Sequence, residues 1–188
     1  MKIFIKNMVC GRCIAAVSHI FNESEIEVTN ISLGEVETKY EVSEDKLQLL
    51  ERFLEETGFE RIKDSSHQLI EKIKNLIILK ISELDIEEDF LLSDFLSKGL
   101  HKDYSILSKT FSQNENLTLE QFFILQKIEK VKELLLYNEL TLTEIAGKLG
   151  YKSVQHLSSQ FRNVTGFTPT AFKKLKIHNR KPLDQIGE

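Results

Sequence analysis

The chain repeats one pattern at an interval of 50 residues. Sliding the sequence against itself by 50 positions, without gaps, superposes Leu92 on Leu142, Asp94 on Glu144, Lys98 on Lys148, Lys102 on Lys152, Leu107 on Leu157, Ser108 on Ser158 and Phe111 on Phe161. A period of this length indicates one supersecondary unit used twice. The second half of the chain is therefore expected to hold two copies of one small helical unit.

The second copy indicates what this unit is. Thr141 and Glu144 have the spacing of a capping box, which begins a helix. Gly150 permits a tight turn, and Ser153 can cap a second helix after it. Two helices joined by so short a turn form a helix-turn-helix. The outer face of the second helix would then carry side chains where a reader of the DNA major groove needs them.

A long helix is expected between the two copies. Thr118 and Gln121 form another capping box. The apolar residues that follow on one helical face are Phe122, Leu125, Ile128, Val131 and Leu135. Before the first copy, another helical face would carry Ile70, Ile73, Ile77 and Ile81. No alternating strand pattern follows residue 65, so this part is expected to be all-helical.

The first 64 residues have a different pattern. Runs that predict strands are Lys2–Lys6, Ile26–Leu33, Glu35–Val42 and Phe59–Ile62. Helical spacing follows Cys13, and a second helix is expected between Ser43 and Gly58. The order βαββαβ is typical of the ferredoxin-like arrangement, a small sheet with two helices on one face.

We therefore expect an α+β protein. Its N-terminal ferredoxin-like βαββαβ domain would span residues 1–64, and an all-α double helix-turn-helix domain would span residues 65–188. The sequence Lys63-Asp64-Ser65-Ser66 is the whole linker between them.

Cys10 and Cys13 are the only cysteines, and they lie between the first strand and the first helix. A close pair in a reducing compartment is typical of metal binding or redox chemistry, not of a disulfide framework. The second cysteine is expected at the helix N-terminus, where the helix dipole and Arg12 favour the thiolate. The thiolate is the form that binds soft metals.

This order of elements, with Met8 two residues before Cys10 and Gly58-Phe59 after the second helix, resembles a heavy-metal-associated (HMA) domain. Such domains occur in copper chaperones and metal-pumping ATPases, although their usual Gly-Met-Thr-Cys here reads Asn7-Met8-Val9-Cys10. Two thiolates suit Cu(I), whereas Zn(II) needs further ligands; Cd(II) and Hg(II) also remain open. The alternatives are thiols that bind nothing and a dithiol redox role. Met8 is expected to pack in the core beneath the loop.

A longer run of motifs lies in the helical half. They are Lys127–Leu135, Leu142–Ala146, Gly150-Tyr151, His156–Ser158, Phe161 and Thr165–Pro169. Together they resemble the AraC/XylS family of bacterial transcription regulators, over residues 68–175. The resemblance implies two reading helices that enter adjacent major grooves of double-stranded DNA.

The resemblance also implies which side chains would meet DNA. They are Ser105, Ser108 and Lys109 from the first reading helix, and Lys152, Ser153, Gln155, His156 and Ser159 at the second. The first copy departs from the family pattern at His101 and Asn116, which stand where glycine is usual. Both are tolerable there, because Asn in particular adopts left-handed backbone conformations.

The net charge of −4 conceals a gradient. Residues 140–188 carry 8 Lys and Arg against 3 Asp and Glu, a net +5, whereas residues 1–64 and 65–139 are acidic, at −5 and −4. A basic end suits a polyanion. Lys173, Lys174 and Lys176 would meet phosphate or solvent. Six acids between Glu83 and Asp94 are expected to be a solvated stretch.

We therefore expect a cytoplasmic, sequence-specific transcriptional regulator that responds to a thiophilic metal ion at Cys10 and Cys13. No apolar run approaches the ~20 residues of a membrane span, so no membrane partner is expected. Nothing in the sequence supports an enzyme, and a homodimer remains open. The alternative function is a metal chaperone or buffer whose helical part docks a protein partner.

Overall fold

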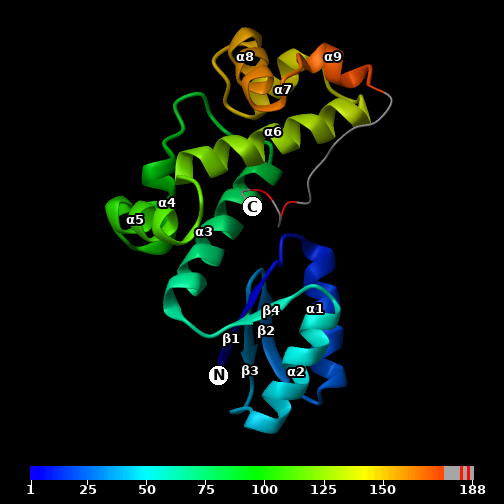
Figure 1. The fold of residues 1–188 in the computed structure, drawn as a ribbon, viewed down its shortest axis with the longest axis vertical. Helices are drawn as coiled ribbons and strands as arrows, with labels where there is room; N and C mark the ends of the chain where they lie inside the picture. Colours follow the sequence, from blue (N-terminus) through cyan, green and yellow to red (C-terminus); the bar gives the residue numbers. More distant parts are fainter. Residues whose placement is uncertain (176–182, 184–185, 187–188) are drawn as a thin grey trace. The chain divides into compact units, whose positions relative to one another are not determined.

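The computed structural model describes residues 1–175, 183 and 186, so Lys176 lies outside the described residues. The chain forms two compact units, Met1–Asn75 and Leu76–Glu188 (Figure 1). The first unit is α+β and the second is built of helices. The predicted α+β class is thereby confirmed.

The first unit contains a four-stranded sheet and two helices, one after the first strand and one after the third. Its elements are β1 (Lys2–Lys6), α1 (Gly11–Glu23), β2 (Val28–Ser32), β3 (Glu35–Thr38), α2 (Glu44–Glu56) and β4 (Glu60–Ile62). The strand order is β2-β3-β1-β4, and every neighbouring pair is antiparallel. Ile3 pairs with Val36 in this register, and Ile5 pairs with Arg61.

One face of this sheet forms the core of the first unit. Ile3, Ile5 and Val36 are almost completely buried, because alternate residues of β1 and β3 point to the same side. The residues that pack against them come from α1 and α2, and include Val17, Ile20, Phe21, Leu47, Leu50 and Leu54. Both helices therefore cover the same face of the sheet.

The predicted strand Glu35–Val42 is shorter in the structure. β3 ends at Thr38, because its neighbour β1 begins at Lys2, opposite Glu37. Tyr40 continues the alternating pattern of the sequence but is 62% exposed. Alternation alone therefore overestimated the length of this strand.

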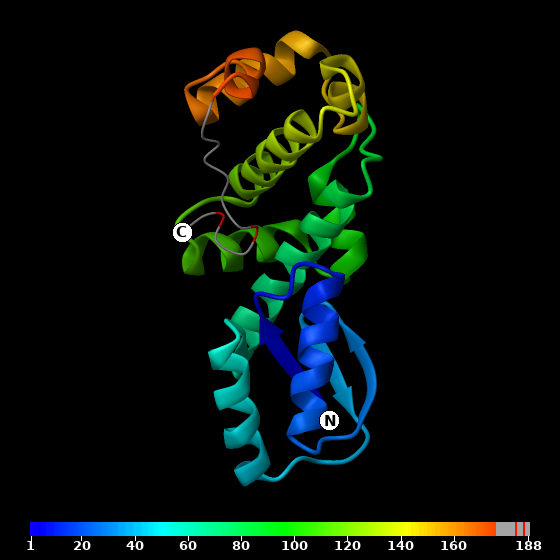
Figure 2. The same cartoon turned by 90° about the vertical axis from the view of Figure 1, so that its right-hand side faces the viewer.

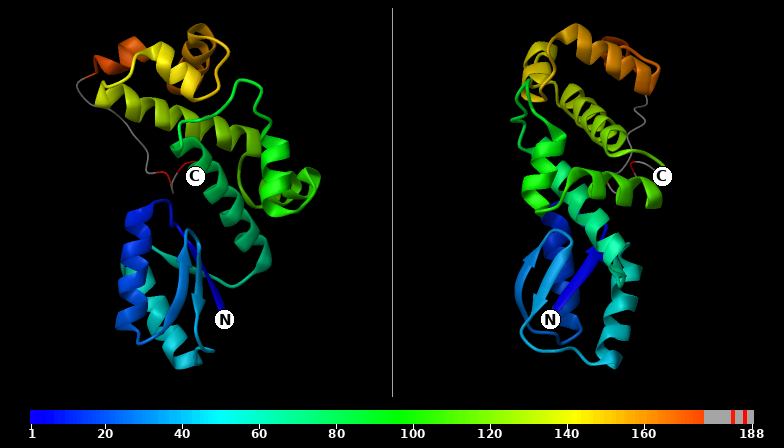
Figure 3. Two further views of the ribbon diagram at one scale, coloured as in Figure 1. Left: turned by 180° about the vertical axis from the view of Figure 1, so that it is seen from behind. Right: turned by 90° about the vertical axis from the view of Figure 1, so that its left-hand side faces the viewer.

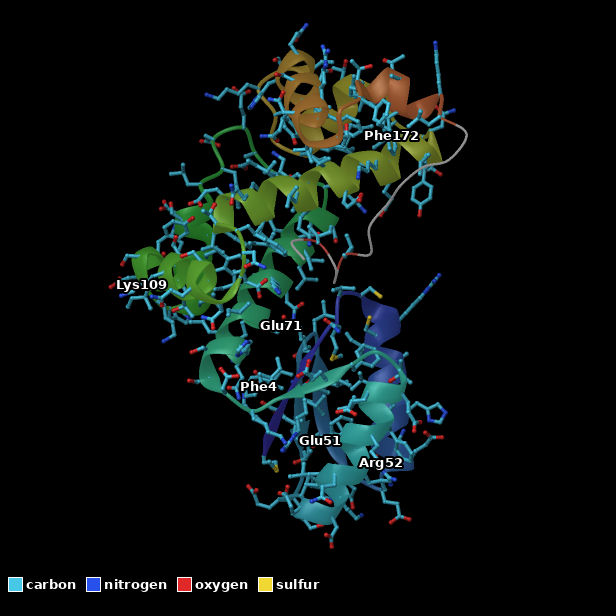
Figure 4. The ribbon with its side chains drawn as sticks, in the orientation of Figure 1. Phe4, Glu51, Arg52, Glu71, Lys109 and Phe172 are labelled. Carbon is cyan, nitrogen blue, oxygen red and sulfur yellow. The ribbon has the colours of Figure 1, made fainter. Side chains whose placement is uncertain are left out.

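The opposite face of the sheet contacts the first part of α3 (Ser65–Ser82). The Lys72 amine lies 4.7 Å from the ring centroid of Phe4 and 3.2 Å from a carboxylate oxygen of Glu35. Phe4 is labelled in Figure 4. Asn75 lies so close to Gly34 that a Cβ at Gly34 would be 2.6 Å from the Asn75 Nδ2 atom. These contacts place the first part of α3 in the sheet unit.

The second unit contains the two copies of the repeated element. Its further helices are α4 (Leu92–Leu100), α5 (Tyr104–Asn114), α6 (Leu119–Tyr137), α7 (Leu142–Lys148), α8 (Val154–Thr165) and α9 (Pro169–Lys173). The helices α4, α5 and α6 begin 50 residues before α7, α8 and α9 respectively. Figures 1, 2 and 3 show that α6 runs between the α4–α5 pair and the α7–α8 pair. The predicted repeat is confirmed by these starting points.

The same side chains form the core of both copies. Leu107 and Phe111 of α5, like Leu157 and Phe161 of α8, have no exposed surface. The predicted capping boxes at Thr118 and at Thr141 are both present. The helix starts and the core of this unit were therefore predictable from residue types and spacing.

His101 and Asn116, which stand where the family usually has glycine, differ in backbone conformation. His101 does adopt the left-handed conformation, with φ 51°, after α4. Asn116 is not among the residues with positive φ, whereas Gly166, its counterpart in the second copy, has φ 80°. The reason is that α5 ends at Asn114 and Glu115 is already extended. No left-handed residue is needed at position 116.

The loop at residues 83–91 makes a contact that sequence patterns did not predict. Its acidic side chains are exposed, as expected, but Ile86 is buried. The Ile86 N–H donates a hydrogen bond of 3.1 Å to the Lys148 carbonyl, and Ile86 forms a parallel bridge with Leu149. This loop therefore packs on the turn of the second helix-turn-helix.

Candidate nucleic-acid interface and cysteine loop

The turn between α7 and α8 is built from small and buried residues. Ile145 and Ala146 are buried on α7, and the Tyr151 N–H donates a hydrogen bond of 2.9 Å to the Ala146 carbonyl. Gly150 makes this turn possible, with φ 66°. Since Leu157 and Phe161 face the core, the opposite side of α8 faces solvent.

The side chains predicted for the second reading helix lie together on this outer side. Gln155, His156 and Ser159 are exposed on α8, and Lys152 and Ser153 are exposed in the turn before it. Ser153 is also the N-cap of α8, because its Oγ accepts a hydrogen bond of 3.1 Å from the His156 N–H.

The first reading helix differs from its prediction. Ser105 and Lys109 are exposed on α5, and Lys109 can be located in Figure 4. Ser108, however, is only partly exposed. Ile106 is 51% exposed and lies 50 residues before His156, yet the predicted set omitted it. The 50-residue interval could have identified Ile106, because it relates this position to His156.

Lysines flank both reading helices. Lys98 and Lys102 line a shallow hollow of about 530 Å³ beside α5, together with His101 and Ile106. Lys148 and Lys152 are exposed at the positions 50 residues later, beside α8. Cations beside an outer polar helix face suit phosphate contacts, which position a protein on DNA without reading its sequence.

The two cysteines meet in the loop between β1 and α1. Cys10 is exposed and is the N-cap of α1, whereas Cys13 is half-buried in the first helical turn. Their Sγ atoms are 3.5 Å apart. Met8 is completely buried beneath the loop, which confirms that it packs in the core.

Cys13 lies in the first turn of α1, as predicted, but Cys10 is the cysteine whose pKa is lowered. Burial raises the pKa of the Cys10 thiol, but hydrogen bonds from the Cys13 backbone and thiol, and the Arg12 charge, outweigh burial and lower it overall. Burial is the main cause of a raised pKa at Cys13. The residue at the helix cap, Cys10, is therefore the one that favours the thiolate.

Asn7 stands where heavy-metal-associated domains usually have glycine, and its backbone adopts a conformation typical of glycine. Its φ is 72°, a conformation that Asn tolerates better than most residues. Its side-chain amide donates a hydrogen bond of 2.9 Å to the Gly58 carbonyl. Asn7 thus ties the cysteine loop to the turn between α2 and β4.

The donors of this loop suit some metals better than others. Among the described residues, no group of three or more His, Cys, Asp or Glu side chains could hold a metal ion. A tetrahedral Zn(II) site needs four ligands, whereas thiolates select Cu(I). The Cys10 and Cys13 thiols would supply two of the four ligands of a Zn(II) site, and as thiolates they also match the ligand type of Cu(I).

Comparisons with known proteins concern the helical unit. Residues 96–175 match the family described as "Helix-turn-helix domain". The chain is 27% identical over 79 residues to the Msm operon regulatory protein of Streptococcus mutans, a match over 42% of this chain and 28% of that protein. It is 32% identical over 91 residues to a helix-turn-helix-type transcriptional regulator of Staphylococcus aureus, over 48% of this chain and 12% of the regulator.

Among solved structures, the chain is similar to the C-terminal domain of the two-component response regulator yesN from Fusobacterium nucleatum. The identity is 31% and the TM-score 0.46, over 54% of this chain and 97% of that domain. The chain spans less than a third of the length of the curated relatives just described. The family match therefore places a helix-turn-helix pattern in residues 96–175. None of the described helices is long and apolar enough to cross a membrane.

Proposed function

We propose that the protein is a DNA-binding transcriptional regulator of the AraC/XylS type. The observation that carries this proposal is the duplication of one helix-turn-helix, with the outer faces of both α5 and α8 exposed. The matched helix-turn-helix family covers the second copy and all but the first four residues of α4 in the first copy, which supports the proposal. Two reading helices joined by α6 would enter two major-groove segments of double-stranded DNA.

The side chains on each face suggest how bases would be read. Gln155 can form two hydrogen bonds with adenine, and Lys109 can donate to guanine. His156 and Ser159 supply further polar groups beside Gln155. Exposed cations such as Lys174 would bind phosphates, which adds affinity for every sequence.

Selection of random DNA duplexes on the full chain tests this proposal. An enriched motif is expected, and Gln155→Ala should weaken binding to it by about 1–3 kcal/mol while relaxing specificity at one position. Lys174→Ala should weaken binding to all sequences alike. Lys46→Ala, which removes a charge from the first unit, is the matched control. If no motif is enriched, the proposed function is wrong.

We further propose that the first unit is a ferredoxin-like, HMA-like domain that binds one soft metal ion, with Cu(I) favoured over Zn(II), Cd(II) and Hg(II). The strand order β2-β3-β1-β4 and the paired thiols of Cys10 and Cys13 support this assignment. Two thiolates would supply the ligands, and Cys10 is the readier to ionise.

Metal stoichiometry measured anaerobically against a competing chelator tests the site. One Cu(I) per chain is expected for the natural sequence, and loss of this binding for the Cys10→Ser/Cys13→Ser double variant. Equal affinity in both proteins would reject the site. If the protein bound Zn(II), Cd(II) or Hg(II) more tightly than Cu(I), that ion would replace Cu(I) in the proposal.

Metal-responsive control of transcription follows if the ion binds two arrangements of the protein with different affinity. The connection between the units supports it, because the boundary at Asn75 and Leu76 lies within α3 and no separate linker segment intervenes. A typical coupling shifts operator affinity about 5- to 150-fold, and DNA shifts metal affinity by the same factor. Titrating operator binding with and without saturating Cu(I) measures it. Unchanged affinity with all four ions would remove metal control from the proposal.

A further inference from the structure

A continuous row of ring and cation contacts joins the two helix-turn-helix copies through α6. On the side of the first copy, the ring of Phe95 on α4 lies 5.4 Å from that of Phe90, measured between centroids. Phe90, from the loop at residues 83–91, stacks on Phe123 of α6 at 5.7 Å. The first copy is therefore attached to α6 by aromatic packing.

Lys127 continues this row toward the second copy. It lies one helical turn after Phe123 on α6, and its Nζ atom is 5.4 Å from the Phe123 ring centroid. The same Nζ atom is only 3.7 Å from the ring centroid of Tyr151. Lys127 is 7% exposed, and burial lowers its pKa to about 8. Its amine is thus a buried cation at pH 7 that is held between two aromatic rings.

Tyr151 connects that cation to the second reading helix. Its hydroxyl donates a hydrogen bond of 2.8 Å to the Gln160 side-chain oxygen on α8. Its ring meets the His156 ring edge-on, at 5.4 Å between centroids and 81° between planes. Through Tyr151, the position of the Lys127 amine is therefore linked to a side chain proposed to read DNA.

The chemistry of this contact favours one orientation of the two copies. A cation removed from water is costly unless other groups replace its hydration. The face of an aromatic ring does so only when the cation lies over it, within about 6 Å of the centroid. If α7 and α8 turned away from α6, the Lys127 amine would lose Tyr151. The contact therefore opposes rotation of the second copy about α6.

We propose that Lys127 is a positioning residue, which acts through Tyr151 to hold α8 in one orientation relative to α5. The protein would consequently accept only one spacing between the two half-sites of its DNA target. The half-site consequence rests on the proposed DNA-binding function, whereas the orientation of the helices does not.

Spin-label distance measurements on the full chain test the orientation without DNA. The labels would be attached in the Cys10→Ser/Cys13→Ser background at Gln113→Cys on α5 and Asn163→Cys on α8, which are exposed and 50 residues apart. A narrow distance distribution is expected at pH 7. Lys127→Met should broaden it, and Lys127→Arg, which keeps the cation, should restore it.

Lys130→Met is the matched control. Lys130 is three residues further along α6 and pairs with Glu133 at 2.7 Å, where both side chains are half-buried. This variant loses the same charge and should leave the distribution narrow. If Lys127→Met also leaves it narrow, the positioning role is wrong. Broadening in both variants would equally overturn the proposal, because it would reflect loss of charge anywhere on α6.

The spacing of the DNA half-sites provides the second readout. For the natural sequence, one base pair inserted between the half-sites of the selected motif should weaken binding at least tenfold, because the bases rotate and shift relative to the fixed helices. For Lys127→Met the same insertion should weaken binding less than about threefold.

The two readouts separate the possible failures. An equal loss of affinity at both spacings would mark Lys127 as a merely structural residue and overturn its positioning role. If no DNA motif is selected, the DNA-binding function fails, and the distance distribution still decides whether Lys127 positions α8.

Discussion

Substituting Gly150 by alanine tests whether the loop at residues 83–91 holds the second helix-turn-helix as the structure indicates. Gly150 has φ 66°, and a Cβ atom added there would lie 2.6 Å from the Glu87 carbonyl oxygen and 2.7 Å from the Ile86 Cγ2 atom. Neither distance is tolerable for a real Cβ. The loop or the turn would have to move.

The expected loss of stability has two parts. A left-handed conformation costs an alanine about 1–2 kcal/mol. The steric conflict with the loop adds about 1–3 kcal/mol, the usual range for overpacking. The free energy of unfolding should thus fall by about 2–5 kcal/mol in Gly150→Ala.

Gly166 provides a control with the same backbone and no neighbour. Its φ is 80°, and a Cβ there would meet nothing within 4 Å. Gly166→Ala should therefore lose only the first part, about 1–2 kcal/mol. The reduced entropy of the unfolded chain affects both variants alike, so it cancels when they are compared.

Urea unfolding of the full chain, followed by far-ultraviolet circular dichroism, measures both variants against the natural sequence. Gly150→Ala should be less stable than Gly166→Ala by about 1–3 kcal/mol. Equal losses would refute the reasoning, because the packing of Ile86 and Glu87 against the turn would then contribute nothing.

Four further predictions can be checked with simple variants or pH series. Burial holds the pKa of Lys127 at about 8, below its usual 10.5, so the unfolded chain binds more protons between these values and stability should rise with pH from 8 to 10. This rise should be absent from urea unfolding of Lys127→Met. Thr141→Ala removes the capping hydrogen bond of α7 and should reduce the free energy of unfolding by about 0.5–2 kcal/mol, by the same assay. Asn7→Gly should be more stable than Asn7→Ala by about 1 kcal/mol, because only glycine keeps the positive φ without strain; the reverse order would contradict the backbone described. Cys10 should react with iodoacetamide faster than Cys13 at pH 7.5 in metal-free protein, as followed by mass spectrometry of each peptide, since its lower pKa gives more thiolate.

The helical half was largely predictable from the sequence because its signals are local. A capping box involves only four consecutive residues, so the sequence directly predicted that helices begin after Thr118 and Thr141. The core positions recur after 50 residues, so one copy checked the other. Residue types predicted β1 at Lys2–Lys6, and in the structure its side chains alternate between exposed and buried positions.

The missed features depend on residues distant in sequence or on side-chain geometry. The contact of Ile86 with Leu149 joins two residues that are far apart in the sequence. Nothing in an acidic stretch indicates that one isoleucine is buried. The sequence did not predict that Ile106 is exposed, because an apolar residue on a helix is ordinarily assigned to the core. Which sulfur favours the thiolate depends on the residue that becomes the helix cap, and Cys10 takes that place.

The loop at residues 83–91 makes the two copies of the repeat unequal as material for protein engineering. Position 150 requires glycine because a side chain there would clash with the loop. Its counterpart in the first copy is Leu100, the last residue of α4. Exchanging whole copies would therefore place a leucine beneath the loop and separate the glycine from it. A chimera that transfers only the outer residues of α8 onto α5 avoids this conflict. Only the turn at Gly150 packs against the loop, so the two turns cannot be exchanged without steric conflict.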